Sequence, residues 1–180
     1  MPEVTNEVNL MLGINTDTTS SSPTQPGRFG AKDVMDLTWK NLMDAYSCTE
    51  CGRCTSACPA NQTGKALSPR KIMMDTRDRL EEVGKNLEIN KGEFVDDGKT
   101  LYKDYISAEE LRACTTCNAC VQECPILISP MDIILQLRRY QIMEESDAPS
   151  SWNAMFSNIE TNQAPWKFAA SDRFNWAKTE

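Results

Sequence analysis

Eight cysteines fall into two runs of identical spacing, and the chain has no others. The cysteines of the two runs are Cys48, Cys51, Cys54 and Cys58, and then Cys114, Cys117, Cys120 and Cys124. A proline follows each run, at Pro59 and Pro125, and every matched position is displaced by the same 66 residues, as from 48 to 114. Soft thiolate ligands suit iron in sulfide clusters. Three of them at two-residue gaps let the backbone curl around one face of a cluster, so the spacing predicts two metal centres.

The gaps are those of the bacterial ferredoxin run, which holds [4Fe–4S] clusters and whose fourth cysteine ligates the other cluster in two-cluster ferredoxins. This resemblance implies a crossed ligand set. The first cluster would be bound by Cys48, Cys51, Cys54 and Cys124, and the second by Cys114, Cys117, Cys120 and Cys58. Crossed ligation would tie the two halves together and hold the clusters close enough for fast electron exchange. Arg53, inside the first run, could moderate the negative charge of its cluster.

Other uses of the cysteines fit the chain less well. Disulfides are typical of small secreted chains, and the N-terminus has no basic region followed by an apolar stretch, as a secretory signal would. Structural zinc usually takes two separated cysteine pairs, and not a triple run with a trailing Cys-Pro. Clusters that only hold the fold together remain an alternative.

Composition excludes several classes of function. The chain of 180 residues has no histidine, which rules out His-ligated haem, Rieske centres and blue copper and removes the commonest general acid–base. Its net charge of −7 argues against a nucleic-acid partner. No apolar run is long enough to span a bilayer, so we expect no transmembrane segment. We therefore expect a protein of a reducing compartment, in the cytoplasm or at the cytoplasmic face of the membrane.

Helices are predicted before and after each cysteine run. Apolar residues recur at steps of three and four from Val34 to Tyr46, which predicts one helix with Trp39 packed in the core. Cap signals predict three further helix starts, at Ser68-Pro69, at Ser107 with Glu110, and at Ser129-Pro130. Gly84 is predicted to end the helix from Pro69, and the helix from Pro130 to be the most buried.

The order of these signals divides the chain into three parts. Residues 1–30 are polar and are predicted to be a disordered linker. Residues 31–149 would form the two-cluster domain, with an irregular insertion at 85–106 that includes a short hairpin around Asp97-Gly98. Residues 150–180 form an extension with six aromatics, Trp152, Phe156, Trp166, Phe168, Phe174 and Trp176. We expect this extension to fold back on the core, the alternative being a contact surface for a partner.

The two cysteine runs set among helices resemble the alpha-helical ferredoxin domain, over about residues 30–178. More closely, they resemble the two-cluster subunit or domain of heterodisulfide reductase-type complexes and the iron–sulfur subunit of anaerobic glycerol-3-phosphate dehydrogenase. The segment from Asn158 to Trp166 resembles the linker that follows this domain in the family. The resemblance implies a mainly α fold, with two pseudo-symmetric helical halves around two [4Fe–4S] clusters. In fused relatives the linker leads into cysteine-rich modules, and this chain stops where such a module would begin, so we expect a separate subunit or part of a longer polypeptide.

The function that the resemblance implies is electron transfer through the two clusters, as a component of an oxidoreductase complex. One partner would be a flavoprotein or another hydride-handling subunit, and the other a cysteine-rich catalytic module or a membrane quinone-linked module. No residue is predicted to be catalytic, because the family's catalytic residues have no positions in this chain. Two alternatives stay open: a non-redox iron–sulfur scaffold or sensor, and a stand-alone soluble carrier of the ferredoxin type.

Overall fold

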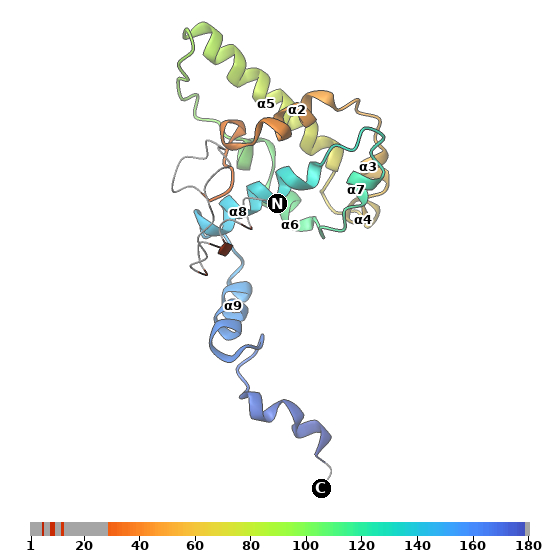
Figure 1. Ribbon diagram of the computed structural model, residues 1–180, viewed down its shortest axis with the longest axis vertical. Coiled ribbons are helices and arrows are strands. Elements are labelled where there is room, and N and C mark those ends of the chain that lie inside the picture. The colour runs from red at the N-terminus through yellow and green to blue at the C-terminus, as the bar shows by residue number, and fades with distance from the viewer. Residues whose placement is uncertain (1–4, 6–7, 10–11, 13–28, 179–180) are drawn as a thin grey trace.

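The structure is a computed structural model that describes residues 5, 8–9, 12 and 29–178. The predicted linker at 1–30 therefore lies almost wholly outside the described residues. Figure 1 shows a body of packed helices and an extension that leads away from it toward the C-terminus. Within the described part of the chain there is no β-strand, and one isolated bridge joins Tyr102 and Ile106. The prediction of a mainly helical fold is confirmed.

Two helical halves make up the body, and equivalent helices of the halves pack against each other. The first half contains α2 Trp39–Ser47, α3 Arg53–Ser56, α4 Pro59–Gln62 and α5 Pro69–Ile89. The second half contains α6 Ala108–Ala113, α7 Ala119–Gln122 and α8 Pro130–Met143. α3 contacts α7, and α5 contacts α8. The predicted internal duplication is therefore present as two halves that pair helix with helix.

Three serines cap helices as their positions in the sequence predict. Ser68 Oγ accepts a hydrogen bond of 3.3 Å from Lys71 N at the start of α5, and Ser129 Oγ accepts one of 3.2 Å from Asp132 N at the start of α8. Ser107 and Glu110 form a capping box at α6, with each side chain accepting from the other's backbone N–H. These contacts satisfy N–H groups that the first helical turn leaves without a partner.

The helix predicted from Val34 to Tyr46 is broken in two, which places Trp39 differently from the prediction. A 3-10 turn, η1 Val34–Asp36, is separated from α2 by Leu37 and Thr38, and Thr38 caps α2. The break changes which face of α2 points inward, so that Asn41, Asp44 and Ala45 are buried. Trp39 is 76% exposed. The prediction that Trp39 packs in the core is wrong.

Gly84 does not end α5, which continues to Ile89. Two contacts beyond the glycine stabilise the additional turn. Leu87 packs against the core, and Asn86 Nδ2 donates a hydrogen bond of 2.8 Å to the backbone carbonyl of Val95. These contacts outweigh the cost of about 1 kcal/mol that glycine imposes inside a helix.

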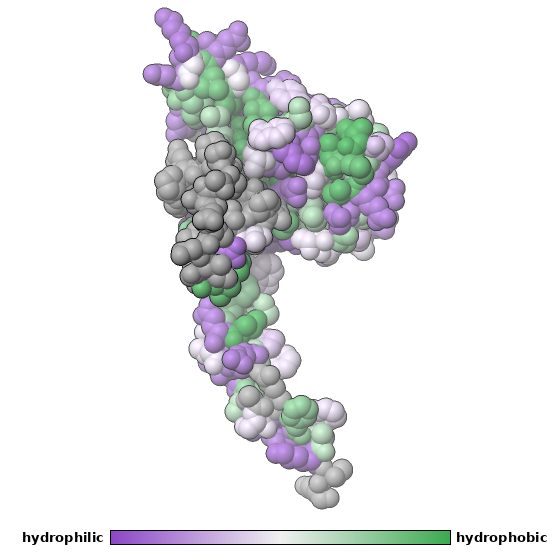
Figure 2. Space-filling view, viewed as in Figure 1, coloured by the Kyte–Doolittle hydropathy of each residue, from purple (hydrophilic) through white to green (hydrophobic). Residues whose placement is uncertain are grey.

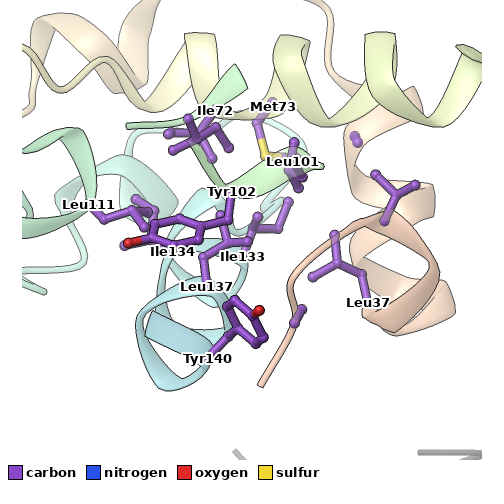
Figure 3. Packing of buried hydrophobic residues seen from close by; sticks show 14 of the residues in the cluster. Leu37, Ile72, Met73, Leu101, Tyr102, Leu111, Ile133, Ile134, Leu137 and Tyr140 are labelled. Carbon is purple, nitrogen blue, oxygen red and sulfur yellow. The ribbon is translucent and has the colours of Figure 1, made fainter. Parts of the chain in front are cut away.

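The hydrophobic core lies between α5 and α8, with η2 Leu101–Tyr105 between them (Figure 3). Half of the residues of α8 are buried, which confirms the prediction for this helix. The rings of Tyr102 and Tyr140 meet edge to face with centroids 6.0 Å apart. This packing sets the orientation of α5 and α8, whose N-terminal ends reach the cysteine runs.

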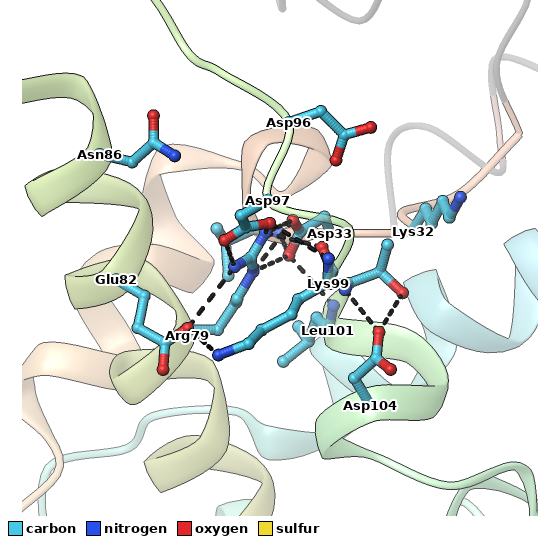
Figure 4. Close-up of polar contacts among 12 residues, drawn as sticks. Lys32, Asp33, Arg79, Glu82, Asn86, Asp96, Asp97, Lys99, Leu101 and Asp104 are labelled. Carbon is cyan, nitrogen blue, oxygen red and sulfur yellow. Dashed lines mark hydrogen bonds and ion pairs between the residues drawn. The ribbon is translucent and has the colours of Figure 1, made fainter. Parts of the chain in front are cut away.

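The segment from Asn90 to Thr100 is irregular, and no strand forms near Asp97-Gly98. The predicted short hairpin there is wrong. The segment is held instead by the buried guanidinium of Arg79, which binds the carboxylates of Asp33 and Asp97 (Figure 4). Because these contacts are made by side chains, they need no strand pairing.

The C-terminal extension does not fold back on the core. It consists of α9 Ser150–Asn162 and η3 Ala170–Ala177, which lead away from the body (Figure 1). All six aromatic side chains are exposed, from 38% for Trp152 to 83% for Trp176. Figure 2 shows apolar surface, in green, along the extension. The prediction of a folded-back extension is therefore wrong. No described helix is both long and apolar enough to cross a membrane.

Candidate metal centres

The first cysteine run forms one side of a hollow of about 380 Å³, a volume that includes open solvent. The cysteines that line it are Cys48, Cys51 and Cys54 from the first run, and Cys120 and Cys124 from the second. Ile128 and Pro130, also from the second half, line the same hollow. The structure therefore brings the fourth cysteine of the second run to the first three cysteines.

The second run forms an equivalent hollow of about 330 Å³. Its cysteines are Cys114, Cys117 and Cys120 from the second run and Cys58 from the first. Leu67 and Pro69, from the first half, also line it. Each hollow therefore combines cysteines of both halves: three from the first run with Cys120 and Cys124 in the first hollow, and three from the second run with Cys58 in the second. These sets include the ligand sets implied for crossed ligation, and the assignment of each thiolate to a cluster stays a prediction.

Other residues of the two walls are also equivalent between the halves. The two Ser-Pro helix starts are 61 residues apart, as from 69 to 130, so residues at this offset occupy equivalent positions. Leu67 and Pro69 of the second hollow correspond to Ile128 and Pro130 of the first. Met73, in the wall of the first hollow, likewise corresponds to Ile134 in the wall of the second. The two hollows are therefore pseudo-symmetric in their walls as well as in their thiols.

The backbone curls around each hollow through two residues with positive φ. These are Glu50 at 57° and Gly52 at 79° in the first run, and Thr116 at 55° and Asn118 at 65° in the second. Glycine and asparagine are the residues that most readily adopt this left-handed conformation. In the second run this turn lets Thr116 N donate a hydrogen bond of 3.4 Å to Cys114 Sγ.

The two runs share an exposed second cysteine but differ in which cysteine is buried, the fourth in the first run and the third in the second. The second cysteine of each run, Cys51 or Cys117, is exposed, whereas Cys58 and Cys120 are buried. Cys120 lines both hollows, so the two sites are neighbours. The two hollows thus share a buried residue, Cys120, and each has one exposed cysteine, Cys51 or Cys117.

Burial raises the pKa of two inner thiols, Cys54 and Cys120, so that they ionise less readily without a metal. It is the main cause that raises the pKa of Cys120 to about 11, and the negative charges of Cys114 and Cys54 add to it. Burial also raises the pKa of Cys54, against a hydrogen bond from Thr55 that lowers it. A bound metal deprotonates coordinating thiols outright. Without a metal, Cys54 and Cys120 would therefore be weak nucleophiles, because the thiolate is the reactive form.

The donor set fits iron–sulfur clusters better than single ions. A zinc site needs four ligand atoms about 2.0–2.3 Å from one ion. In the described part of the chain, no three Cys, Asp or Glu side chains gather closely enough around one such position. Each hollow instead gathers at least four cysteines, the number of thiolates that a [4Fe–4S] cluster takes.

One charged residue beside the first site was missed by the sequence analysis. Arg53 is not among the residues that line the first hollow, whereas Arg70 of α5 is. The signal was present in the sequence, because Arg70 follows the Ser-Pro pair that begins α5. Its meaning depends on how α5 packs beside the first run.

Comparison with known proteins extends these observations. Residues 47–128 match the family model of the 4Fe-4S dicluster domain. The chain is 32% identical over 176 residues to a probable iron–sulfur-binding oxidoreductase, FadF, of Bacillus subtilis, covering 82% of this chain and 25% of that protein. It is 31% identical over 166 residues to the EtfAB:quinone oxidoreductase of Syntrophomonas wolfei, covering 82% and 23%.

A third relative is a subunit of the ferredoxin/F(420)H(2)-dependent CoB-CoM heterodisulfide reductase of Methanosarcina acetivorans. The identity is 30% over 115 residues, covering 63% of this chain and 56% of that subunit. The chain spans about a quarter of the length of FadF and of the quinone oxidoreductase. The family match at residues 47–128 contains all eight cysteines.

Proposed function

Because residues 47–128 belong to the 4Fe-4S dicluster domain family and the homologues include FadF-like oxidoreductases and heterodisulfide reductase subunits, we propose that the chain relays electrons inside an oxidoreductase complex. The cofactors of the domain are two [4Fe–4S] clusters. Each cluster accepts and releases single electrons when bound. The protein's part is to hold the clusters at a short separation and to leave one face of each near the surface.

The observation that carries the proposal is the pair of neighbouring hollows, each lined by at least four cysteines. They share Cys120, and each has one exposed cysteine, Cys51 or Cys117. An electron that enters near one exposed cysteine would cross the shared wall and leave near the other. We assign Cys48, Cys51, Cys54 and Cys124 to the first cluster, and Cys114, Cys117, Cys120 and Cys58 to the second.

The partners we propose are a flavoprotein on one side and a cysteine-rich or quinone-linked module on the other. The names of two relatives support this choice, since one is an EtfAB:quinone oxidoreductase and the other a heterodisulfide reductase subunit. The exposed aromatics of the extension favour a subunit or domain over a free carrier, because contiguous apolar surface usually marks an interface. A quinone-linked partner would place the chain at the cytoplasmic face of the membrane.

A reductive titration of the anaerobically purified chain tests the relay. Iron and sulfide analysis should give two four-iron clusters per chain, and a viologen-mediated titration followed by electron paramagnetic resonance should show two reversible one-electron reductions. Potentials of such clusters span roughly −700 to +450 mV. Clusters that load fully but take up no electron across that range would favour the scaffold alternative.

A second measurement separates a subunit from a free carrier. Size-exclusion chromatography of the chain with and without residues 150–178 should show self-association or partner binding only where the aromatic extension is present. A free carrier would instead run as a monomer in both forms and exchange electrons equally well in both.

A further inference from the structure

The two hollows have matching walls but differ at one pair of equivalent positions. Arg70 and Met131 each follow the Ser-Pro pair that begins the long helix of their half, α5 or α8. Arg70 lines the first hollow and Met131 lines the second. The first site therefore faces a guanidinium where the second faces a thioether.

The guanidinium of Arg70 lies over the loop between Cys51 and Cys54. Its Nη1 atom is 3.8 Å from the position that a Cβ would occupy at Gly52. Within the described residues, no carboxylate forms an ion pair with this guanidinium. The one hydrogen bond that Arg70 makes there outside its own helix is donated by its backbone N to Thr55 Oγ1, at 3.2 Å. Its positive charge therefore stays uncompensated beside the first site.

The other charges around the two sites differ in their partners. Glu50, in the wall of the first hollow, forms an ion pair with Arg77, so these two charges offset each other. Arg138, which occupies the position equivalent to Arg77, donates to the backbone carbonyls of Leu111 and Cys114. Among the residues that line the two hollows, Arg70 is the one cation.

We propose that Arg70 raises the reduction potential of the first cluster, and that the difference between Arg70 and Met131 sets part of the potential step between the two clusters. Reduction adds one electron, and hence one negative charge, to a cluster, while no bond forms or breaks. A nearby cation stabilises that added charge, and neighbouring charge is one of the factors that set cluster potentials. This inference rests on the proposed electron relay. It names Arg70 as the residue that favours the electron on the first cluster.

Potentiometric titration of the full chain, loaded with iron and sulfide under anaerobic conditions, tests the inference. Dithionite supplies the electrons through viologen mediators, and electron paramagnetic resonance reports both midpoints. Arg70→Met should lower one midpoint by about 59 mV or more, a tenfold change in a one-electron equilibrium. Met131→Arg should raise the other midpoint by a similar amount. The double variant should show both shifts.

Two control variants separate charge from structure. Arg70→Lys keeps the charge and should leave the midpoint near its original value. Lys85→Met removes an exposed cation of the same helix, 15 residues from Arg70, or about 22 Å along its axis, and should move neither midpoint.

The result that overturns the inference is an Arg70→Met variant with full iron whose midpoints match those of Lys85→Met. The inference is also overturned if Met131→Arg and Arg70→Met shift the same midpoint. If Arg70→Met fails to bind its iron, Met131→Arg becomes the test, and unchanged midpoints in that variant overturn the inference. Wild-type clusters that cannot be reduced would instead contradict the proposed relay, so the two failures are distinguishable.

Discussion

Arg79 and Asp33, 46 residues apart in the chain, form a two-point ion pair in the interior. Arg79 Nη2 lies 2.7 Å from Asp33 Oδ2, and Arg79 Nε lies 3.0 Å from Asp33 Oδ1. On its other side the same guanidinium binds Asp97, with Nη1 2.6 Å from Oδ2, and hydrogen bonding from Arg79 lowers the pKa of Asp97 to about 2. The Arg79 side chain has no exposed surface. One side chain of α5 thus connects the start of the domain to the irregular segment before η2.

Replacing this arginine should destabilise the domain strongly. Arg79→Met leaves the carboxylates of Asp33 and Asp97 facing each other without a cation, and breaking a buried ion pair from one side costs about 3–5 kcal/mol. Anaerobic urea unfolding of the cluster-loaded protein measures this loss. Lys99→Met is the matched control, since its pair with Glu82 is exposed and should contribute about 0–1 kcal/mol. Equal stabilities for the two variants would contradict the role of Arg79.

Serine substitutions at single cysteines test the crossed assignment of ligands. Cys58→Ser should damage the second cluster although it lies in the first run, and Cys124→Ser should damage the first. In each case the iron content should fall by about half, because one of two clusters is lost. Cys51→Ser and Cys117→Ser provide the reference spectra for loss of the first and the second cluster. If the spectrum of Cys58→Ser matches that of Cys51→Ser, each run holds its own cluster and the crossed assignment is wrong.

Gly30 is predicted to tolerate no side chain. A Cβ there would lie 2.4 Å from the carbonyl oxygen of Gln136 and 2.5 Å from the backbone nitrogen of Tyr140, both in α8. Gly30→Ala should lower the free energy of unfolding by about 1–3 kcal/mol beyond the cost of its positive φ. Gly64 is the control, because it has nearly the same φ, 79° against 78°, with no atom within 4 Å of the added Cβ. Thermal unfolding of the two alanine variants should separate them, and coincident melting curves would show that Gly30 is not closely packed.

Removal of iron should loosen the cysteine-bearing helices before the core. α3 has no buried residue, and α4 and α7 have one each, so these four-residue helices depend on metal for their order. After anaerobic treatment with an iron chelator, amide exchange should accelerate in residues 48–63 and 114–125. The buried amides of α8 should keep most of their protection, because Ile133, Leu137 and Tyr140 pack in the core and line neither hollow. Uniform loss of protection would show instead that the clusters hold the whole domain together.

The chemistry of the sites and the starts of the helices could be predicted from the sequence alone. The spacing of the cysteines predicts two [4Fe–4S] clusters, and the capping residues Ser68, Ser107 and Ser129 begin the helices that they were expected to begin. Such signals are local, because a cap or a ligand run is satisfied by residues within a few positions of it. The pairing of the halves also followed from the sequence, since a repeated pattern folds into a repeated structure.

Which side chains face which neighbours depends on the packing of distant segments. Trp39 is exposed because a break at Thr38 changes the inward face of α2, where Asp44 accepts a hydrogen bond from Ser129 N of the other half. α5 passes Gly84 because Asn86 and Leu87 find partners beyond it. Arg70 lies over the first cysteine loop because of the way α5 packs beside that loop. In each case the residue and the partner that decides its position are at least nine positions apart in the sequence. A local sequence pattern does not identify such a distant partner.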